Sequence, residues 1–256
     1  MSVSSLRASE PDVHYPESDG KPMAETEIHR DEMMDTIAAL KRRYRDAMDV
    51  YVGGNMLFYY VEGQPKHCVA PDVFVVHGVP KRKRRVYLLW TEGRSPSFVI
   101  EVTSNSTRRE DLAKKKVLYE RLGVEEYFLH DPLGEYLKPQ LQGFRLADGI
   151  YQPIPREGDG SLASRTTGLR LRSEGENLRL LDATTGERLL WVDEVDTARE
   201  EAEAGRQEAE AGRQEAEASR QAAETDRQTA EMRLAKEVAV RRALEEELAR
   251  LRGSGT

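Results

Sequence analysis

Residues 98–102 read Phe98-Val99-Ile100-Glu101-Val102, an apolar run of strand length with a single carboxylate inside it. A strand that is apolar at nearly every position is usually covered on both faces, so this one belongs inside a sheet. A carboxylate buried there is costly unless a proton, a cation or hydrogen bonds compensate for its charge. Glu101 therefore either serves a site or pairs with an arginine of the sheet, and both readings stay open.

Two helices are expected in the segments around this strand. Helical spacing of apolar residues predicts one over residues 25–45. A second is predicted over residues 108–122, because Thr107 and Glu110 have the spacing of a capping box and Gly123 stands where a C-cap glycine belongs. With the strands described next, these helices indicate a mixed α/β domain.

The remaining strands are short and well punctuated by turn residues. Gly53-Gly54-Asn55 predicts a hairpin turn between strands 50–52 and 56–61. Further strands are expected over residues 73–76, 86–90 and 126–129. Residues 142–192 alternate short β-like stretches with turns, so they predict small antiparallel strands that continue the same domain.

Two more charged residues occupy positions where packing alone would not place them. Asp72 follows Pro71 and opens an apolar strand. On a helix that turns about 100° per residue, Lys115 falls in the middle of the apolar arc that includes Leu112 and Tyr119. Purely structural alternatives stay open. Asp72 could be an ordinary turn or strand-start residue, and Lys115 could be a surface lysine that pairs with Asp111 four residues earlier.

Two carboxylates and a lysine together suit metal-assisted hydrolysis of a phosphodiester. Asp72 and Glu101 would hold Mg²⁺, a hard cation that prefers oxygen ligands. Such an ion polarises the phosphate and lowers the pKa of a bound water. Lys115 would orient or activate that water and offset the charge that develops on phosphorus.

Charge is unevenly distributed along the chain. The 256 residues include 39 Lys and Arg against 46 Asp and Glu, and this net charge of −7 excludes a strongly basic nucleic-acid binder at whole-chain level. Residues 194–252 hold 16 of the acids and 11 of the bases, and every aromatic residue lies at or before Trp191. We therefore expect a disordered segment 1–20, a globular domain 21–193 and a charged helical tail 194–256.

Several other protein classes are excluded by the composition. Cys68 is the only cysteine, which excludes a disulfide scaffold. No stretch approaches the roughly 18 apolar residues that span a bilayer. The N-terminal stretch through Asp19 lacks the apolar core of a secretory signal. A cytoplasmic protein without membrane contact is expected.

The tail has a seven-residue repeat that is typical of a long helix with coiled-coil tendency. Residues 201–207 and 208–214 both read EAEAGRQ, and 215–221 reads EAEASRQ. Alanines occupy one seam position and Leu244 and Leu251 continue it, while arginines hold most of the other. We expect this helix either to pair with another copy, mainly through residues 234–251, or to remain single.

The ordered set of these motifs resembles the Uma-type family of putative restriction endonucleases, a branch of the PD-(D/E)XK nuclease superfamily. The resemblance covers about residues 20–190 and rests on Pro71-Asp72, the Glu101 strand, Ser104-Asn105-Ser106-Thr107, and Asp111, Lys115 and Tyr119. It continues through Gly123-Val124-Glu125-Glu126-Tyr127 and Asp131-Pro132. It implies a restriction-endonuclease-like α/β core with a central mixed sheet flanked by helices, and a Mg²⁺-dependent nuclease site, with Mn²⁺ as a substitute, at Asp72, Glu101 and a lysine.

The sequence departs from the superfamily pattern at the lysine. The usual position, two residues after the glutamate, holds Thr103, whereas Uma-type members carry the lysine on the following helix, as Lys115 stands here. The resemblance also implies an additional acid from the first helix, for which Glu25 or Glu27 is the candidate; the alternative is that both simply belong to a solvated helix start. His130 stands where the family usually has an apolar residue, and we assign it no role.

Basic residues near the site are the candidates for contact with the DNA backbone. They are Lys81, Arg82, Lys83, Arg84, Arg85, Arg108 and Arg109. The alternative is a solvated basic hairpin. Nothing in the sequence encodes the cleavage site, strand specificity or sensitivity to methylation.

Two functions from different classes follow. The first is a Mg²⁺-dependent DNA endonuclease that forms a homo-oligomer through its C-terminal helix. The second is a nuclease-fold protein that binds DNA or a partner without cleaving, with the tail as its working part.

Overall fold

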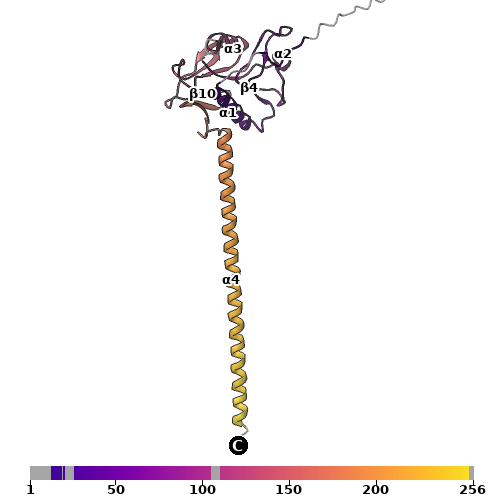
Figure 1. Cartoon of the computed structure of the whole chain (residues 1–256), viewed down its shortest axis with the longest axis vertical. Helices are drawn as coiled ribbons and strands as arrows, with labels where there is room; N and C mark the ends of the chain where they lie inside the picture. The colour runs from indigo at the N-terminus through magenta and orange to yellow at the C-terminus, as the bar shows by residue number, and fades with distance from the viewer. Residues whose placement is uncertain (1–12, 19, 21–25, 105–109, 254–256) are drawn as a thin grey trace, which may run out of the picture. The chain divides into compact units, whose positions relative to one another are not determined.

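The computed structural model describes residues 13–18, 20, 26–104 and 110–253. Its centre is a six-stranded sheet with the order β1-β4-β6-β7-β8-β9, of which Figure 1 labels β4. Within it, β6 and β7 run parallel, while the other neighbouring strands are antiparallel, so the predicted mixed sheet is confirmed. The six strands are β1 (Val50–Gly53), β4 (Val73–His77), β6 (Phe98–Val102), β7 (Glu126–His130), β8 (Leu141–Ala147) and β9 (Ile150–Pro153).

Two three-stranded sheets complete the β-structure. One joins β10 (Leu162–Ser164), β11 (Leu169–Glu174) and β12 (Asn177–Asp182), which confirms the small antiparallel strands expected after residue 142. The other joins β3 (Cys68–Val69), β2 (Phe58–Tyr59) and β5 (Tyr87–Leu88). The strand expected over 86–90 is therefore shorter, because the chain turns into the one-turn helix α2 (Leu89–Glu92).

The predicted hairpin between strands 50–52 and 56–61 is wrong. β1 pairs with β4, and β2 pairs with β3 and β5. The glycines between them serve close packing, because a Cβ on Gly53 would lie 2.6 Å from the ring of Phe74 and one on Gly54 would lie 2.2 Å from the carbonyl oxygen of Asp72.

Helix α1 (Glu27–Arg43) confirms the first predicted helix, and the Thr26 hydroxyl caps it by accepting from the His29 amide at 3.3 Å. The second predicted helix has two parts, a π-helical segment (Glu110–Lys115) and then α3 (Lys116–Leu122). Gly123 ends α3 with φ +76°, as its predicted C-cap role requires. Thr107, the other half of the proposed capping box, lies outside the described residues.

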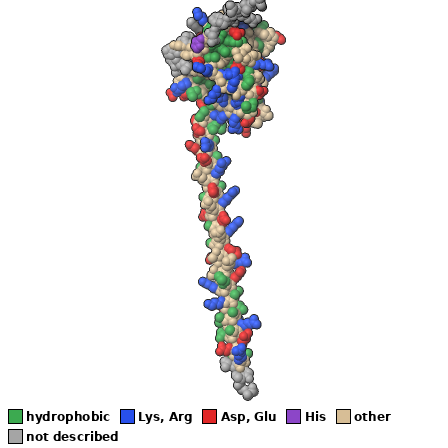
Figure 2. Space-filling model, turned by 90° about the vertical axis from the view of Figure 1, so that its right-hand side faces the viewer, with side chains coloured by type: hydrophobic (Ala, Val, Ile, Leu, Met, Phe, Trp, Pro, Cys, Tyr) green, Lys and Arg blue, Asp and Glu red, His purple; other side chains and the backbone are tan. Residues whose placement is uncertain are grey.

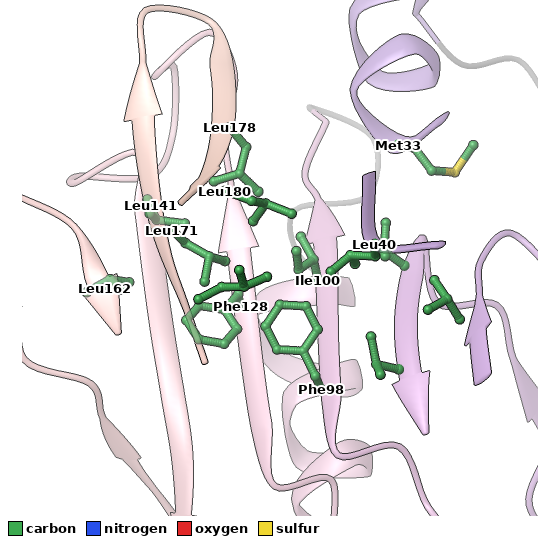
Figure 3. Close-up of a cluster of buried hydrophobic side chains, with 14 of the residues drawn as sticks. Met33, Leu40, Phe98, Ile100, Phe128, Leu141, Leu162, Leu171, Leu178 and Leu180 are labelled. Atoms are coloured by element: carbon green, nitrogen blue, oxygen red, sulfur yellow. The ribbon is translucent and has the colours of Figure 1, made fainter. Parts of the chain in front are cut away.

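Side chains are packed on both faces of the central sheet. Alternate residues of β6 point to opposite faces, so Phe98 and Ile100 enter one cluster and Val99 enters the other. The first cluster joins α1 and the β10–β12 sheet, where the rings of Phe98 and Phe128 lie 5.1 Å apart (Figure 3). The second contains Tyr119 of α3. Strand β6 is therefore covered on both faces, as its sequence predicts.

Residues 13–18 contradict part of the prediction that the chain is disordered through residue 20. The Tyr15 ring packs against Tyr59 and Trp90, each with a centroid distance of 5.1 Å. The Tyr59 hydroxyl donates to the carbonyl of Pro16 at 2.7 Å. An aromatic side chain and a hydrogen bond thus hold a segment whose composition is otherwise polar.

Contacts divide the chain into one unit that ends at Glu194 and a second that begins at Val195. The second unit consists of helix α4 (Val192–Gly253) beyond its first residues. Acidic and basic side chains are interspersed along this helix (Figure 2). None of the helices in the described ranges has both the length and the apolar character needed to cross a membrane.

Candidate active site

The pairing of β4 with β6 brings the two predicted carboxylates together. Val73 pairs with Ile100, and the same antiparallel register continued by one residue sets Asp72 opposite Glu101. The Asp72 amide lies 3.4 Å from Glu101 Oε2, and the Val102 amide donates to Asp72 Oδ2 at 2.8 Å. Each carboxylate therefore accepts from a backbone amide on the other strand segment: Glu101 from the amide of Asp72, and Asp72 from the amide of Val102, which follows Glu101.

The π-helical segment supplies the lysine. Lys115 Nζ lies 2.8 Å from Glu101 Oε2 and 2.9 Å from Asp111 Oδ1. Its side chain is 14% exposed, while those of Glu101 and Asp111 are 0% and 1% exposed, so this is an interior cluster. Glu101 pairs with this lysine and not with an arginine of the sheet.

The wide π-helical turns change which apolar residues face inward. Leu112, which an α-helical wheel places on the buried arc, is 37% exposed, whereas Tyr119 is 1% exposed. The Tyr127 hydroxyl donates to the Asp111 carbonyl at 3.0 Å within this segment. Lys115 points inward, as the helical wheel predicts. Its ion pairs with Glu101 and Asp111 hold it there, and a wheel does not show such contacts. Such π-helical segments are frequent at functional sites.

Two residues join the cluster from other elements. The Tyr119 hydroxyl donates to Glu101 Oε1 at 2.6 Å. His29 of α1 approaches Asp72 with Nε2 at 3.1 Å from Oδ2. His29 was not among the site residues predicted from the sequence, although its spacing from Met33 places it on the inward face of the first helix.

Burial and charge act differently on the two carboxylates. Burial raises the pKa of Glu101 well above its ordinary value; the charge of Lys115 opposes this, and those of Asp72 and Asp111 reinforce it. Burial also acts to raise the pKa of Asp72, but the hydrogen bond from His29, the charge of Lys115 and the Val102 amide outweigh it and hold that pKa low. The two acids therefore have opposite tendencies to keep a proton.

Lys115 remains protonated in this environment. Burial alone lowers the pKa of a lysine, but the charges of Glu101, Asp111 and Asp72 outweigh it and raise the pKa of Lys115 above its ordinary value. The cluster therefore offers a permanent hydrogen-bond donor.

The donor set fits a divalent cation that keeps some of its water. Glu101 and Asp111 both contact Lys115, and Asp72, whose side chain is 13% exposed, adjoins Glu101, so three acids share one lysine. No hydrogen bond among the described residues uses Asp72 Oδ1. In that part of the chain, no group of three or more His, Cys, Asp or Glu side chains is arranged to hold a metal. Mg²⁺ commonly binds through one or two carboxylates, with water and substrate phosphate as its other ligands.

The backbone of Gly54 packs closely against the backbone of Asp72. Its Cα faces the Asp72 carbonyl and the side chain of Ile37 so closely that an added Cβ would lie 2.2 Å and 2.5 Å from them. The glycines at residues 53 and 54 therefore allow close packing beside Asp72 and do not form a hairpin turn.

The basic run of residues 81–85 lies near the edge strand β1. Its residues 81–84, but not Arg85, line a groove of about 630 Å³ that extends to Gly53 and Gly54. The groove is also lined by Lys41, Tyr44, Tyr51 and Met56. Arg84 is 1% exposed, pairs with Glu92 at 2.7 Å and stacks 4.2 Å above the Tyr51 ring. Lys81 donates to the Arg45 carbonyl at 2.8 Å, Arg82 pairs with Glu92 at 2.7 Å, and Arg85 pairs with Glu17.

The other candidates from the sequence have different outcomes. Glu25, Arg108 and Arg109 lie outside the described residues. Glu27 has an 82% exposed side chain and lies 3.9 Å from Arg30. His130 is fully buried, with Nδ1 2.5 Å from Glu32 Oε1 and Nε2 3.1 Å from Ser173 Oγ.

Comparison with known proteins gives a family match and a structural match. The model of the family described as Uma2, putative restriction endonuclease, matches residues 4–176. Among solved structures, a putative nuclease belonging to DUF820 from Anabaena variabilis ATCC 29413 is 15% identical, with a TM-score of 0.43 over 57% of this chain and 76% of that one. No curated protein matches the chain.

Proposed function

The chain belongs to the Uma2 family of putative restriction endonucleases, and from that premise we propose that it is a metal-dependent endonuclease that hydrolyses phosphodiester bonds of DNA. The observation that carries the proposal is the approach of Lys115 Nζ to within 2.8 Å of Glu101 Oε2, beside the opposed Asp72. Three separate elements supply these groups, and each is held by further hydrogen bonds.

Asp72 and Glu101 would hold the ion, with Mg²⁺ as the first choice and Mn²⁺ as a substitute. When bound, the ion supplies polarisation of the phosphate and acidification of a water. Asp72 has the lower pKa of the two, so it stays ionised at neutral pH and provides the firm anionic ligand. Glu101 has both oxygens engaged by donors of the chain, Tyr119 and Lys115, which hold its side chain in a single orientation.

Lys115 acts as a donor in this proposal. Its raised pKa keeps the ammonium charged, so it is unsuited to remove a proton from water. It would instead donate to a phosphate oxygen or to the attacking water and offset the negative charge that develops at phosphorus.

The groove along β1 is the surface that we propose for the phosphate backbone. Lys41 and Lys83 contribute charge to it, and Lys81 adds a third lysine. Arg84 is committed to Glu92 and Tyr51, so we expect it to shape the groove more than to contact DNA. The end of the groove at Gly54 adjoins the Asp72 backbone, which connects the basic surface to the site.

Plasmid nicking by the purified full chain tests the proposal. With Mg²⁺, the wild type should convert supercoiled plasmid to nicked and linear forms, and Asp72→Asn and Glu101→Gln should abolish this. Asp46→Asn is a matched control, because its side chain is 91% exposed. Equal nicking by wild type and both site variants would indicate a contaminating nuclease and overturn the assignment.

A second candidate is a nuclease-fold protein that binds DNA or a partner without cleaving it. The engagement of both Glu101 oxygens by donors of the same chain favours it, because an ion must compete with Lys115 for that carboxylate. DNA binding in a gel-shift assay, with no nicking in Mg²⁺ or Mn²⁺, would support this candidate over the enzyme.

For the charged helix we propose self-association. Apolar side chains along its C-terminal half are more than half exposed, and they include Leu234, Leu244 and Leu248 on the two seam positions of the heptad. A second copy of the chain would cover this seam and bring two nuclease sites into one particle.

A further inference from the structure

Helix α1 places two ionisable side chains, one turn apart, in the buried interface with the central sheet. His29 is 6% exposed and Glu32 is 3% exposed, and they belong to the same inward face as Met33. Burial of a polar side chain costs free energy unless the side chain forms a hydrogen bond, so the partners of these two residues indicate why they are not apolar.

Glu32 anchors the helix to the end of β7. Its Oε1 lies 2.5 Å from His130 Nδ1, and His130 Nε2 continues to Ser173 Oγ of β11 at 3.1 Å. All three partners come from different elements, so the chain of contacts fixes the position of α1 over the sheet. His29, one turn earlier, is thereby held against the start of β4.

At that point His29 meets Asp72. Its Nε2 lies 3.1 Å from Asp72 Oδ2, the same oxygen that accepts from the Val102 amide at 2.8 Å. A carboxylate oxygen accepts and does not donate when ionised, so Nε2 carries the proton in this contact. Both donors act on one oxygen, and the other, Oδ1, is the one left for an ion.

We infer that His29 is a positioning residue for Asp72, which fixes the rotation of the carboxylate so that Oδ1 faces the metal position. The inference rests on the proposed function, because it assigns Asp72 to a divalent cation. His29 itself contacts neither the ion nor the substrate. Hydrogen-bond partners of metal ligands typically contribute a factor of about 10–100 in metal affinity or activity.

Three variants separate this role from a packing role. His29→Leu removes the donor and keeps a buried side chain. His29→Gln restores an amide N–H near the place of Nε2. The matched control is His77→Gln, because His77 lies at the opposite end of β4 and its Nδ1 is 2.6 Å from Ser97 Oγ.

Two readouts are measured on the full chain. Binding of Mn²⁺ in the absence of DNA is followed by calorimetry, and the Mg²⁺ concentration for half-maximal nicking is measured separately. Thermal unfolding of each variant establishes that it is folded. His29→Leu should weaken Mn²⁺ binding and raise the half-maximal Mg²⁺ concentration by about 10-fold or more. His29→Gln should recover most of this loss, and His77→Gln should match the wild type.

The outcomes distinguish the inference from the proposed function. Folded His29→Leu protein with wild-type Mn²⁺ affinity and Mg²⁺ requirement would overturn the role of His29 while the nuclease assignment stands. Wild-type protein that binds Mn²⁺ but does not nick would overturn the nuclease assignment, and the binding series would still decide the role of His29. If the wild type neither binds nor nicks, both are overturned. If His29→Leu fails to fold, the decision rests on His29→Gln. Mn²⁺ affinity and Mg²⁺ requirement equal to those of the wild type support the inference, whereas a loss of about 10-fold or more in folded His29→Gln overturns it.

Discussion

Lys115 Nζ lies 2.8 Å from Oε2 of Glu101, whose carboxylate is completely buried in the central sheet. The pair joins a strand that is apolar on both faces to a π-helical segment, and it converts an unfavourable buried acid into one half of an ion pair. Asp111, at 2.9 Å from the same nitrogen, increases the negative charge that Lys115 must balance.

Replacement of this lysine should remove activity while the fold survives. In Lys115→Met, Glu101 can take up a proton, because burial already raises its pKa. We expect nicking to fall by about 100-fold or more, as for the loss of a single donor to developing charge. Plasmid nicking at saturating Mg²⁺ measures the loss, and circular dichroism checks the fold.

Lys114→Met is the matched control for that variant. Lys114 is the preceding residue of the same segment, but its side chain is exposed. Its replacement should leave the rate per bound DNA within about two-fold, since a surface charge near DNA affects binding more than chemistry. Similar losses in the two variants would assign the effect to general charge and contradict a specific role for Lys115.

The position of this cluster could be predicted because its signals are local. Glu101 stands out inside an apolar strand, and Lys115 interrupts an apolar helix face. The register of β4 against β6, which sets Asp72 opposite Glu101, is seen only in the structure, because a strand that is apolar on both faces has no alternation to fix its register.

The contact of His29 with Asp72 and the true pairing of the strands on either side of residues 53–55 could not be predicted by the same means. His29 acquires its partner only when α1 docks on the sheet, and the contact joins residues that are 43 positions apart. A pair of glycines before Asn55 has the local pattern of a turn, but close packing against Phe74 and Asp72 selects glycine equally well. Tertiary contacts overrode the local signal in both cases.

Gly54 should be sensitive to the addition of one methyl group. In Gly54→Ala, the new Cβ would lie 2.2 Å from the Asp72 carbonyl oxygen, a backbone atom, so β4 or α1 must shift. We expect a loss of about 1–3 kcal/mol in unfolding free energy, as for overpacked interiors, together with loss of nicking because Asp72 moves. Urea unfolding and plasmid nicking measure the two effects.

Gly158→Ala provides the comparison for that substitution. A Cβ at Gly158 would meet no atom within 4 Å, so its stability and nicking should equal those of the wild type. Wild-type activity in Gly54→Ala would show that the site tolerates a displaced Asp72 backbone, contrary to the packing argument.

Glu126 of β7 predicts a pH-dependent contribution to stability away from the site. Burial acts to raise its pKa, but hydrogen bonds from Ser164, the Arg165 amide, Arg145 and Thr166 outweigh it and lower the pKa below its ordinary value. An acid with a lowered folded-state pKa contributes stability above its unfolded pKa, about 4.3, and loses it as the pH falls through the folded value. Glu126→Gln should therefore cost about 2–3 kcal/mol at pH 7, where a charge-assisted network is lost.

Urea unfolding at pH 7 and at pH 4 measures this contribution. The difference between wild type and Glu126→Gln should shrink at the lower pH, because the wild type approaches protonation of the same carboxyl group. Glu125→Gln, the exposed neighbour, should show no difference at either pH. A gap between wild type and Glu126→Gln that grows on acidification would contradict the sign of this argument.

The seam of α4 gives a prediction about assembly. Leu244 and Leu248 have side chains that are 55% and 54% exposed, and they stand on the two heptad positions that face a partner in a coiled coil. If a second copy covers them, the double substitution Leu244→Ser and Leu248→Ser in the full chain should lower the sedimentation coefficient to that of a single chain. Val240→Ser is the matched control, because Val240 is 53% exposed but lies off the seam, and it should leave sedimentation unchanged. A wild type that already sediments as one chain across the concentration range would refute self-association through α4.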